Sequence, residues 1–331
     1  MLALSMIFCL MMGPASIAAP EAGWELTKIE DRDYVSLHSI KRAYNFEKMS
    51  RSGNAVVLEN SKVSVKLTVG GNECLMNGVK FVLSHEIACS GDKIYISRID
   101  LSKLIDPVLR PNFIQNAGDF RTVILDAGHG GHDSGATNSL GTEASYNLKV
   151  AGLVKTQLEA KGFKVVMTRN SHIFLPLQER VNVANNVKEN AIFVSIHFNA
   201  GASHARGIET FTLSPPSVPH YGSGVKGSDF SKRAGNEHDS SNIALATSLH
   251  GSMLRRLGKH TFDRGIKRAR FSVLSGVRHP AVLFEGGFMS HPYEARLIAN
   301  AQYQAAIAGG IVDSVAKYRF AVARKFTATP N

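Results

Sequence analysis

The chain has 331 residues, of which 44% are hydrophobic, so it can bury one large core or two ordinary ones. This composition, with no long low-complexity tract, excludes an intrinsically disordered chain. Lysine and arginine outnumber aspartate and glutamate by 38 to 27, and the resulting charge of +11 favours a polyanionic partner or serves solubility alone.

Residues 1–19 have the pattern of a secretory signal peptide. No charged side chain occurs in them, and an apolar run from Leu2 to Met12 precedes small residues that place a cleavage site near Ala18 or Ala19. The run is too short to span a bilayer, which requires about 20 apolar residues. We therefore expect export to the periplasm, the cell wall or the extracellular space, with no transmembrane segment after cleavage.

Cleavage would remove Cys9 and leave Cys74 and Cys89. In an exported protein an even pair of cysteines can form a disulfide, and two separate thiols are the alternative. The sequence contains no CxxC motif and no cluster of cysteine with histidine. Any metal in this protein must therefore be held by histidine and carboxylate side chains.

Residues 24–112 contain short strands and short helices with a weak internal duplication. Aligning Tyr34 with Tyr95 also pairs Val35 with Ile96, and a helix-like run follows each extended stretch. The pattern YVSL…YIS resembles the copper amine oxidase N-terminal-like domain, a small repeat domain attached to bacterial wall enzymes. The resemblance implies a smaller α+β accessory or wall-binding domain.

From Arg121 onward, after a polar linker at 116–119, the pattern changes to alternating strands and helices. Strands are expected at 122–125, 163–168, 191–196 and 281–284, and helices at 146–161, 177–187 and 303–318. This alternation predicts an α/β fold with a mainly parallel twisted sheet flanked by helices.

Three residues that can carry chemistry lie at or just beyond the ends of apolar strands, namely His129, His197 and Glu285. The ligand crevice of an open α/β sheet lies at the carboxyl ends of its strands, so these side chains are expected to converge. Catalytic zinc is bound by histidine and carboxylate ligands with one position left for water. Glu143 is well placed as the carboxylate, although stabilisation of a helix N-terminus alone would also explain it.

Residues 121–319 resemble the zinc-dependent N-acetylmuramoyl-L-alanine amidase family (type 3), whose catalytic domain has a zinc exopeptidase-like fold. The matching motifs occur in family order: VILDAGHGG, Glu143 with Asn147-Leu148, MTRNSHIFLPLQERVNVAN, FVSIHFNA, RGIETF and PAVLFEGGFMSHPYEARLI. The resemblance implies a zinc hydrolase that cleaves the amide between N-acetylmuramic acid and L-alanine in peptidoglycan, for wall remodelling or cell separation. It also implies that His129, Glu143 and His197 bind Zn²⁺ and that Glu285 is the general base and acid.

Three further residues are expected to act around this site. We expect Asp126 to orient His129 and Asn199 to hydrogen-bond near the metal. Arg206 is expected to contact a substrate carboxylate or the loop before Glu209. Of the other candidates, His132 is not expected to be a ligand, and Arg180 is expected to form a structural salt bridge.

The stretch 214–242, rich in Pro, Gly, Ser and Lys, is expected to form a long loop over the site. Its basic residues Lys226, Lys232 and Arg233 would meet anionic glycan or stem-peptide carboxylates. No amphipathic run suggests a helix that blocks the site. A protein activator is a further possible partner.

Three alternatives compete with the amidase. A zinc exopeptidase on wall-derived peptides shares the chemistry, but a two-metal enzyme would need additional bridging residues. A non-catalytic wall-binding protein would not need the intact set of candidate residues. A nucleic-acid binder explains the charge but not the leader, so no nucleic-acid partner is expected.

Overall fold

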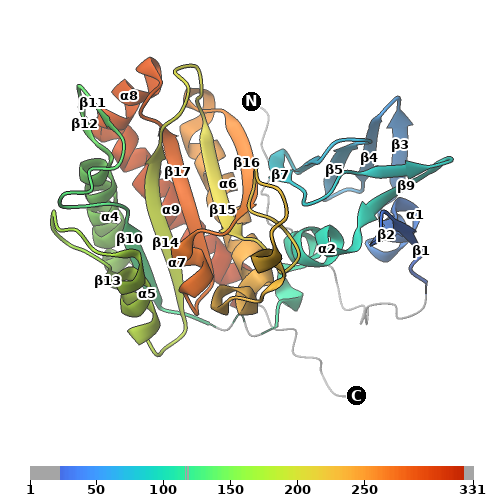
Figure 1. Cartoon of the computed structure of the whole chain (residues 1–331), viewed down its shortest axis with the longest axis horizontal. Coiled ribbons are helices and arrows are strands. Elements are labelled where there is room, and N and C mark those ends of the chain that lie inside the picture. Colours follow the sequence, from blue (N-terminus) through green and yellow to red (C-terminus); the bar gives the residue numbers. More distant parts are fainter. Residues whose placement is uncertain (1–22, 116, 118, 324–331) are drawn as a thin grey trace. The chain divides into compact units, whose positions relative to one another are not determined.

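The structure is a computed structural model that describes residues 23–115, 117 and 119–323 (Figure 1). The predicted signal peptide at 1–19, with Cys9, lies outside the described residues. The chain divides into an N-terminal unit that ends at Asp106 and a C-terminal unit that begins at Pro107. None of the helices within the described residues is long and apolar enough to cross a membrane.

The N-terminal unit combines two antiparallel sheets with short helices. One sheet has the order β1–β2–β9–β8, formed by β1 (Leu26–Ile29), β2 (Arg32–Ser36), β9 (Lys93–Ser97) and β8 (Ala88–Ser90). The other strands pair in chain order, namely β3 (Lys48–Ser52), β4 (Ala55–Glu59), β5 (Ser64–Thr68), β6 (Glu73–Met76) and β7 (Val79–Val82). The helices are α1 (Leu37–Ala43) and α2 (Arg98–Asp100), which continues into a π-helical turn at Leu101–Ile105.

The internal duplication predicted from the sequence is present as two equivalent strand–helix units. Strand β2 leads into α1 and β9 leads into α2, and in each unit a serine caps the helix. The Ser36 hydroxyl accepts a hydrogen bond from the backbone N–H of His38, and Ser97 accepts one from Asp100. The two units pair with each other, with Val35 opposite Ile96.

Cys74 and Cys89 are both free thiols in the structure. Cys74 lies buried on β6, whereas Cys89 is exposed on β8, which belongs to the other sheet of the unit. Of the two arrangements that the sequence left open, the structure has the separate thiols.

The C-terminal unit is built on a twisted sheet with the strand order β13–β10–β14–β17–β15–β16. Every neighbouring pair is parallel except β15 with β17, so the prediction of a mainly parallel α/β sheet is confirmed. The strands are β10 (Thr122–Ala127), β13 (Lys164–Met167), β14 (Ala191–Asn199), β15 (Ile208–Leu213), β16 (Asp263–Ala269) and β17 (Ala281–Phe288).

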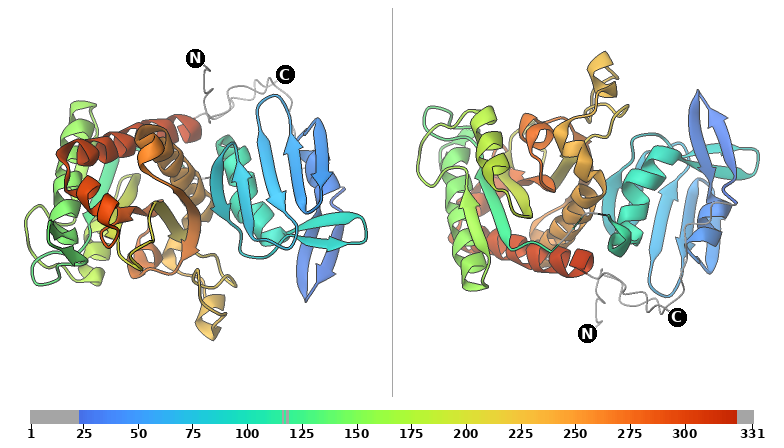
Figure 2. Two further views of the ribbon diagram at one scale, coloured as in Figure 1. Left: turned by 90° about the horizontal axis from the view of Figure 1, so that it is seen from above. Right: turned by 90° about the horizontal axis from the view of Figure 1, so that it is seen from below.

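Helices cover both faces of this sheet (Figures 1 and 2). One face packs against α5 (Leu177–Asn186) and α7 (Ser272–Gly276), and the other against α4 (Glu143–Ala160), α6 (Asp239–Leu257) and α9 (Ala301–Ala323). The remaining elements are α3 (Asp106–Leu109), α8 (Pro292–Ala299) and a small hairpin of β11 (Thr137–Asn138) and β12 (Gly141–Thr142). Short 3₁₀ turns occur at Pro111–Phe113, Gly227–Phe230, Ala234–His238 and Gly258–His260. The central strands are buried on both faces, as apolar runs in parallel sheets predict.

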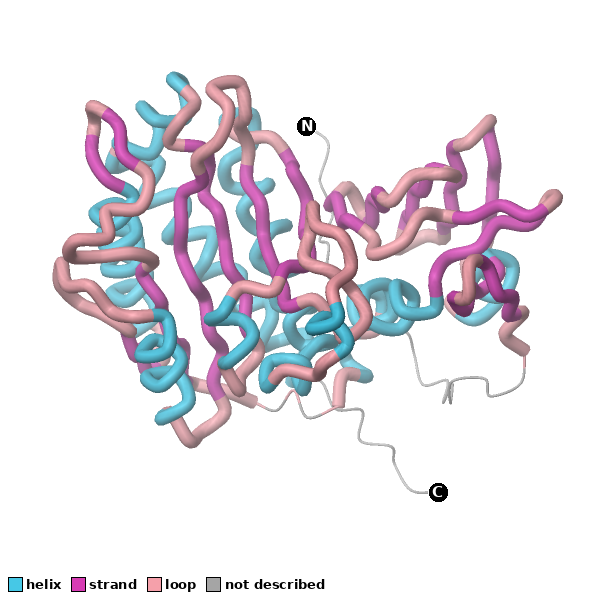
Figure 3. Tube along the Cα trace, viewed as in Figure 1, coloured by secondary structure: helices cyan, strands magenta, loops and turns pink. Residues whose placement is uncertain are grey.

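The stretch after β15 does not lie over the carboxyl ends of the central strands, so that prediction is wrong. Because β15 runs antiparallel to β17, it ends at the opposite edge of the sheet. Loops and short helical turns follow there (Figure 3), hydrogen-bonded to Arg268 and Arg270 at the end of β16. Among the described residues, the predicted contacts Lys226, Lys232 and Arg233 touch none of the candidate site residues.

Candidate active site

The turn after β10 brings the backbone unusually close to two candidate ligand side chains. A Cβ atom on Gly128 would lie 2.1 Å from the His197 ring, and one on Gly135 would lie 2.5 Å from a carboxylate oxygen of Glu143. His129 itself has a φ of 60°, in the left-handed region that residues other than glycine rarely adopt. Gly128 and Gly135 therefore serve a close approach of backbone to side chains.

Two buried arginines hold this turn by its carbonyl groups. Arg169 donates hydrogen bonds to the carbonyl oxygens of Ala127 and Gly128, both at 2.8 Å. Arg180 donates to the carbonyl oxygens of Ala127 and His129, also at 2.8 Å. Each arginine is only 2% exposed, so the hydrogen bonds are formed away from water and fix the direction of the turn.

Asp126 does not contact His129 itself, and its predicted orienting role can act only through Arg180, which donates to the carbonyl oxygen of His129. Its carboxylate accepts hydrogen bonds from Thr168 and Ser195 at 2.7 Å and pairs with Arg180 at 2.8 Å. Burial alone would raise the pKa of Asp126, but the Arg180 charge and these hydrogen bonds lower it below its usual value. The predicted structural salt bridge of Arg180 is thereby confirmed.

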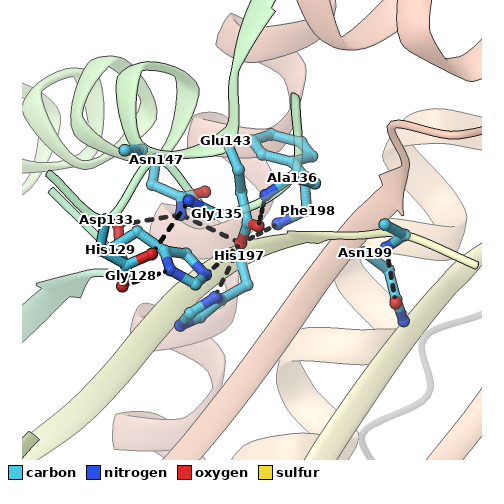
Figure 4. Close-up of polar contacts among 12 residues, drawn as sticks. Gly128, His129, Asp133, Gly135, Ala136, Glu143, Asn147, His197, Phe198 and Asn199 are labelled. Carbon is cyan, nitrogen blue, oxygen red and sulfur yellow. Dashed lines mark hydrogen bonds and ion pairs between the residues drawn. The ribbon is translucent and has the colours of Figure 1, made fainter. Parts of the chain in front are cut away.

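His129, Glu143 and His197 converge at the carboxyl ends of β10 and β14 (Figure 4). Glu143 Oε1 lies 3.2 Å from His129 Nε2 and 2.9 Å from His197 Nδ1. One ligand atom from each of the three residues lies within 4.8 Å of the others. These donor atoms form a cluster that can hold a metal ion.

His129 and Glu143 are each oriented by contacts from outside the cluster. Asp133 lies 2.8 Å from His129 Nδ1, which leaves Nε2 to face Glu143. The backbone N–H of Ala136 donates to Glu143 Oε2 at 2.9 Å, and Asn147 Nδ2 donates to Oε1 at 3.4 Å. The sequence reading missed Asp133, although a carboxylate four residues after a candidate ligand in the same glycine-rich turn was an available signal.

The cluster favours an ionised Glu143. Burial alone would raise the pKa of Glu143, but the hydrogen bonds from His129 and His197 lower it well below its usual range. The hydrogen bond to Glu143 in turn raises the pKa of His129, against the opposing effect of burial. A cation placed among the three groups would meet a carboxylate that is already charged.

Glu285 lies beside this cluster on β17, directly opposite His197 on β14. Its Oε2 atom is buried and has no hydrogen-bond partner among the described residues. Burial raises the pKa of Glu285 well above its usual value, and the charges of Glu143 and Glu209 raise it further. A carboxyl with one buried, unpaired oxygen and a raised pKa can hold or release a proton beside the cluster.

The other predicted residues lie outside the cluster. Asn199 lies apart from it in Figure 4, and its side-chain amide is 3.5 Å from Glu209. Arg206 stacks on the Phe262 ring at 3.8 Å, and the ring of His132 packs against Phe174 at 4.1 Å.

An α/β sheet with a His–Glu–His cluster that can hold a metal and a half-buried glutamate at its carboxyl edge is an arrangement suited to a hydrolase. Comparison with known proteins specifies the family: the model for N-acetylmuramoyl-L-alanine amidases (Amidase_3) matches residues 123–317. The chain belongs to this family.

The similar proteins include further enzymes of this kind. N-acetylmuramoyl-L-alanine amidase LytC of Bacillus subtilis is 33% identical over 208 residues, which cover 62% of this chain and 37% of LytC. The catalytic domain of CwlV from Bacillus (Paenibacillus) polymyxa var. colistinus superposes with a TM-score of 0.50 at 32% identity, over 60% of this chain and 98% of CwlV. The CwlD amidase of Clostridioides difficile, solved in complex with the GerS lipoprotein, has a TM-score of 0.50 at 27% identity, over 60% of this chain and 98% of CwlD.

Proposed function

We propose that this protein is a zinc-dependent amidase that hydrolyses the bond between the lactyl group of N-acetylmuramic acid and L-alanine in peptidoglycan. The observation that carries the proposal is the convergence of His129, Glu143 and His197 in a chain of the amidase family. Two imidazole nitrogens and one carboxylate are a donor set that catalytic zinc uses while one position stays open. Zinc bound there would supply a Lewis acid for the amide carbonyl and a water of lowered pKa.

Glu285 is the proposed general base and acid. It takes a proton from the attacking water and passes it to the nitrogen of L-alanine as the carbon–nitrogen bond breaks. Its raised pKa supports the second half of this role, because a carboxyl with a raised pKa can donate a proton near neutral pH. Gly286, which follows on β17, lies against the Phe198 ring, so a larger side chain next to Glu285 would displace that ring.

The proposed setting is the bacterial cell wall, outside the cytoplasm. The +11 charge favours binding to an anionic wall polymer, and the N-terminal unit is the proposed accessory wall-binding domain. The proposed role is wall remodelling or cell separation. A protein activator is a further proposed partner, which the CwlD–GerS complex supports by likeness.

The exopeptidase alternative is less well supported. Within residues 23–115, 117 and 119–323, His129, Glu143 and His197 are the one group of three or more His, Cys, Asp or Glu residues placed to hold a metal. A two-metal exopeptidase would require a second set of ligands beside the first.

The test uses purified sacculi and a synthetic muramoyl-peptide, incubated with the protein with and without a chelator. The expected product is a peptide with a new L-alanine amino terminus, detected by amine labelling and mass spectrometry. Its formation should stop with the chelator and resume when Zn²⁺ is added back. Amide cleavage that survives complete removal of metal would overturn the zinc mechanism, and cleavage elsewhere in the stem peptide would favour the exopeptidase.

A further inference from the structure

A β-bulge interrupts the pairing of β15 with β16, and β15 in turn pairs with β17, the strand that carries Glu285. Ile208 on β15 pairs with Asp263 on β16, but Thr210 pairs with Ile266, so two residues of β16 face the single residue Glu209. These two residues are Arg264 and Gly265, and Gly265 has the positive φ of 89° that such a bulge favours. Bulges redirect side chains, and this one brings Arg264 onto Glu209.

Glu209 is buried, with 4% of its surface exposed, and is paired with two cations. Arg264 donates through Nε to Glu209 Oε1, and Lys267 Nζ lies 2.9 Å from the same oxygen. The cluster of Glu209, Arg264 and Lys267 therefore carries one positive charge in excess. Lys267 is itself buried, at 3%, so the excess charge can reach a ligand only through Arg264.

Arg264 is partly exposed, and half of its guanidinium group has no hydrogen-bond partner among the described residues. Its side chain is 36% exposed and its guanidinium carbon lies 4.8 Å from the centre of the Phe288 ring. Only Nε is hydrogen-bonded to another described residue, which leaves the two terminal nitrogens as donors. Two parallel N–H donors on a rigid fork match the two oxygens of a carboxylate.

This fork lies within reach of a peptide bound for cleavage beside Glu285. Glu209 is the direct cross-strand neighbour of Glu285, and Arg264 follows on the next strand. Adjacent strands are about 4.8 Å apart, so the Arg264 backbone lies roughly 10 Å from that of Glu285 and its long side chain shortens the gap. An extended peptide advances about 3.3–3.6 Å per residue, so a group one or two residues beyond the cleaved amide can reach Arg264.

We propose that Arg264 binds the carboxylate of the residue that follows L-alanine in the stem peptide, and that Glu209 positions Arg264 for this contact. The inference rests on the proposed amidase function. In peptidoglycan stem peptides that residue carries an α-carboxyl group that is either free or amidated. Arg264 would make the enzyme prefer the free acid.

The experiment compares two ligands that differ only at this group, L-alanyl-D-glutamate and its α-amide L-alanyl-D-isoglutamine. Binding of each dipeptide to the zinc-loaded full chain is measured by calorimetry, and hydrolysis of the corresponding muramoyl-dipeptides is measured in parallel. The wild type should favour the acid about tenfold or more, because hydrogen bonds to charged groups are the strong ones. Arg264→Gln should abolish the preference through loss of affinity for the acid.

Two further variants separate binding from folding. Arg264→Lys keeps the charge but not the fork, and should retain only part of the preference. Arg278→Gln removes an exposed arginine just before β17, at the opposite end of that strand, and should behave as the wild type. Glu209→Gln should weaken binding of the acid. Its melting temperature is measured in parallel to show that the variant is folded.

The outcomes distinguish the inference from the function on which it rests. Wild-type protein that binds both dipeptides equally would overturn the role of Arg264, whether or not it hydrolyses the amide. An acid preference that persists in a folded Arg264→Gln variant would overturn it as well. Absence of amide hydrolysis in the zinc-loaded wild type would instead overturn the proposed function, and the dipeptide binding would still report on Arg264.

Discussion

Replacing Gly128 by alanine should break the metal-binding cluster while the chain stays folded. The new Cβ would lie 2.1 Å from Cε1, 2.4 Å from Nε2 and 2.6 Å from Nδ1 of His197. Ordinary van der Waals contact begins at 3.4 Å, so the closest ring atom must move from 2.1 Å to that distance, a shift of about 1.3 Å. Ligand distances in metal sites vary by only about 0.2 Å. A His197 ring displaced this far could no longer bind a metal ion together with Glu143 and His129.

The magnitude follows from what is lost. Changes that only perturb the surroundings of a ligand lower metal affinity roughly 10–100-fold, and displacement of His197 itself should exceed that range. Forcing a methyl group into a packed site costs about 1–3 kcal/mol of folding free energy. For a domain of this size each kcal/mol lowers the melting temperature by about 2–4 °C, so the variant should remain folded at 25 °C.

Zinc affinity is measured by competition with a chromogenic chelator, and folding by circular dichroism. The matched control is Gly152→Ala in the middle of α4, where a Cβ would meet nothing within 4 Å. That change should leave zinc affinity unchanged and stabilise the helix by about 0.5–1 kcal/mol. If folded Gly128→Ala protein bound zinc as tightly as the wild type, the close packing of backbone against His197 would not govern the site.

Three further predictions concern other parts of the molecule. Glu285→Gln should lower kcat about 10²–10⁴-fold with zinc content unchanged, and a zinc-loaded variant with wild-type turnover would exclude Glu285 as the base. Asp126→Asn should lose about 3–5 kcal/mol of stability in urea unfolding at pH 7, because it leaves Arg180 buried without its counter-ion. Because the folded-state pKa of Asp126 is lowered, the ion pair stabilises the protein above about pH 4 and this stabilisation is lost as the pH falls further. The unfolding free energies of variant and wild type should therefore converge in acid. An equally large difference between them in acid would contradict the role of the Asp126–Arg180 pair. In a chain that starts after the predicted leader, a thiol reagent should modify the exposed Cys89 in the native protein but Cys74 only after unfolding. The reason is that Cys74 is buried and burial raises its pKa. Equal rates of modification of the two thiols in the native protein would refute this.

The apolar pattern of the sequence predicted four strands of the C-terminal sheet, β10, β13, β14 and β17, and three of its helices, α4, α5 and α9. Strands β10 and β14 contain the apolar runs 123–125 and 191–194, each followed by a polar residue, the pattern of strands buried on both faces. The same pattern located His129, His197 and Glu285, because parallel strands end at one edge of the sheet. Chain order and period were enough for this part of the site.

Helix α6 and strand β16 were not predicted, for opposite reasons. Helix α6 (Asp239–Leu257) buries serine, threonine, asparagine and histidine along with its apolar residues, so it has no polar face to reveal the helical period. Strand β16 (Asp263–Ala269) contains three basic residues and a glycine, which read as a loop. Its extended conformation depends on pairing with β15 and on Glu209, which are tertiary contacts. The reversed direction of β15 also depends on tertiary contacts. Because this direction was not predicted, the stretch 214–242 was expected at the wrong end of the sheet.

The orientation of His129 shows why the surroundings of the cluster were harder to predict than its members. The left-handed backbone of a histidine costs about 1 kcal/mol or more, which must be offset by contacts that exist only in the folded chain. Those contacts come from Arg169 and Arg180, which donate hydrogen bonds to backbone carbonyl groups. Every residue has such a carbonyl group, so the sequence does not indicate which one an arginine will bind. Asp126 contributes to the orientation of His129 only indirectly, as the counter-ion of Arg180. The geometry of His129 therefore depends on two guanidinium groups that lie 41 and 51 positions after the carbonyl groups they bind, and substitutions there should change metal affinity without touching a ligand.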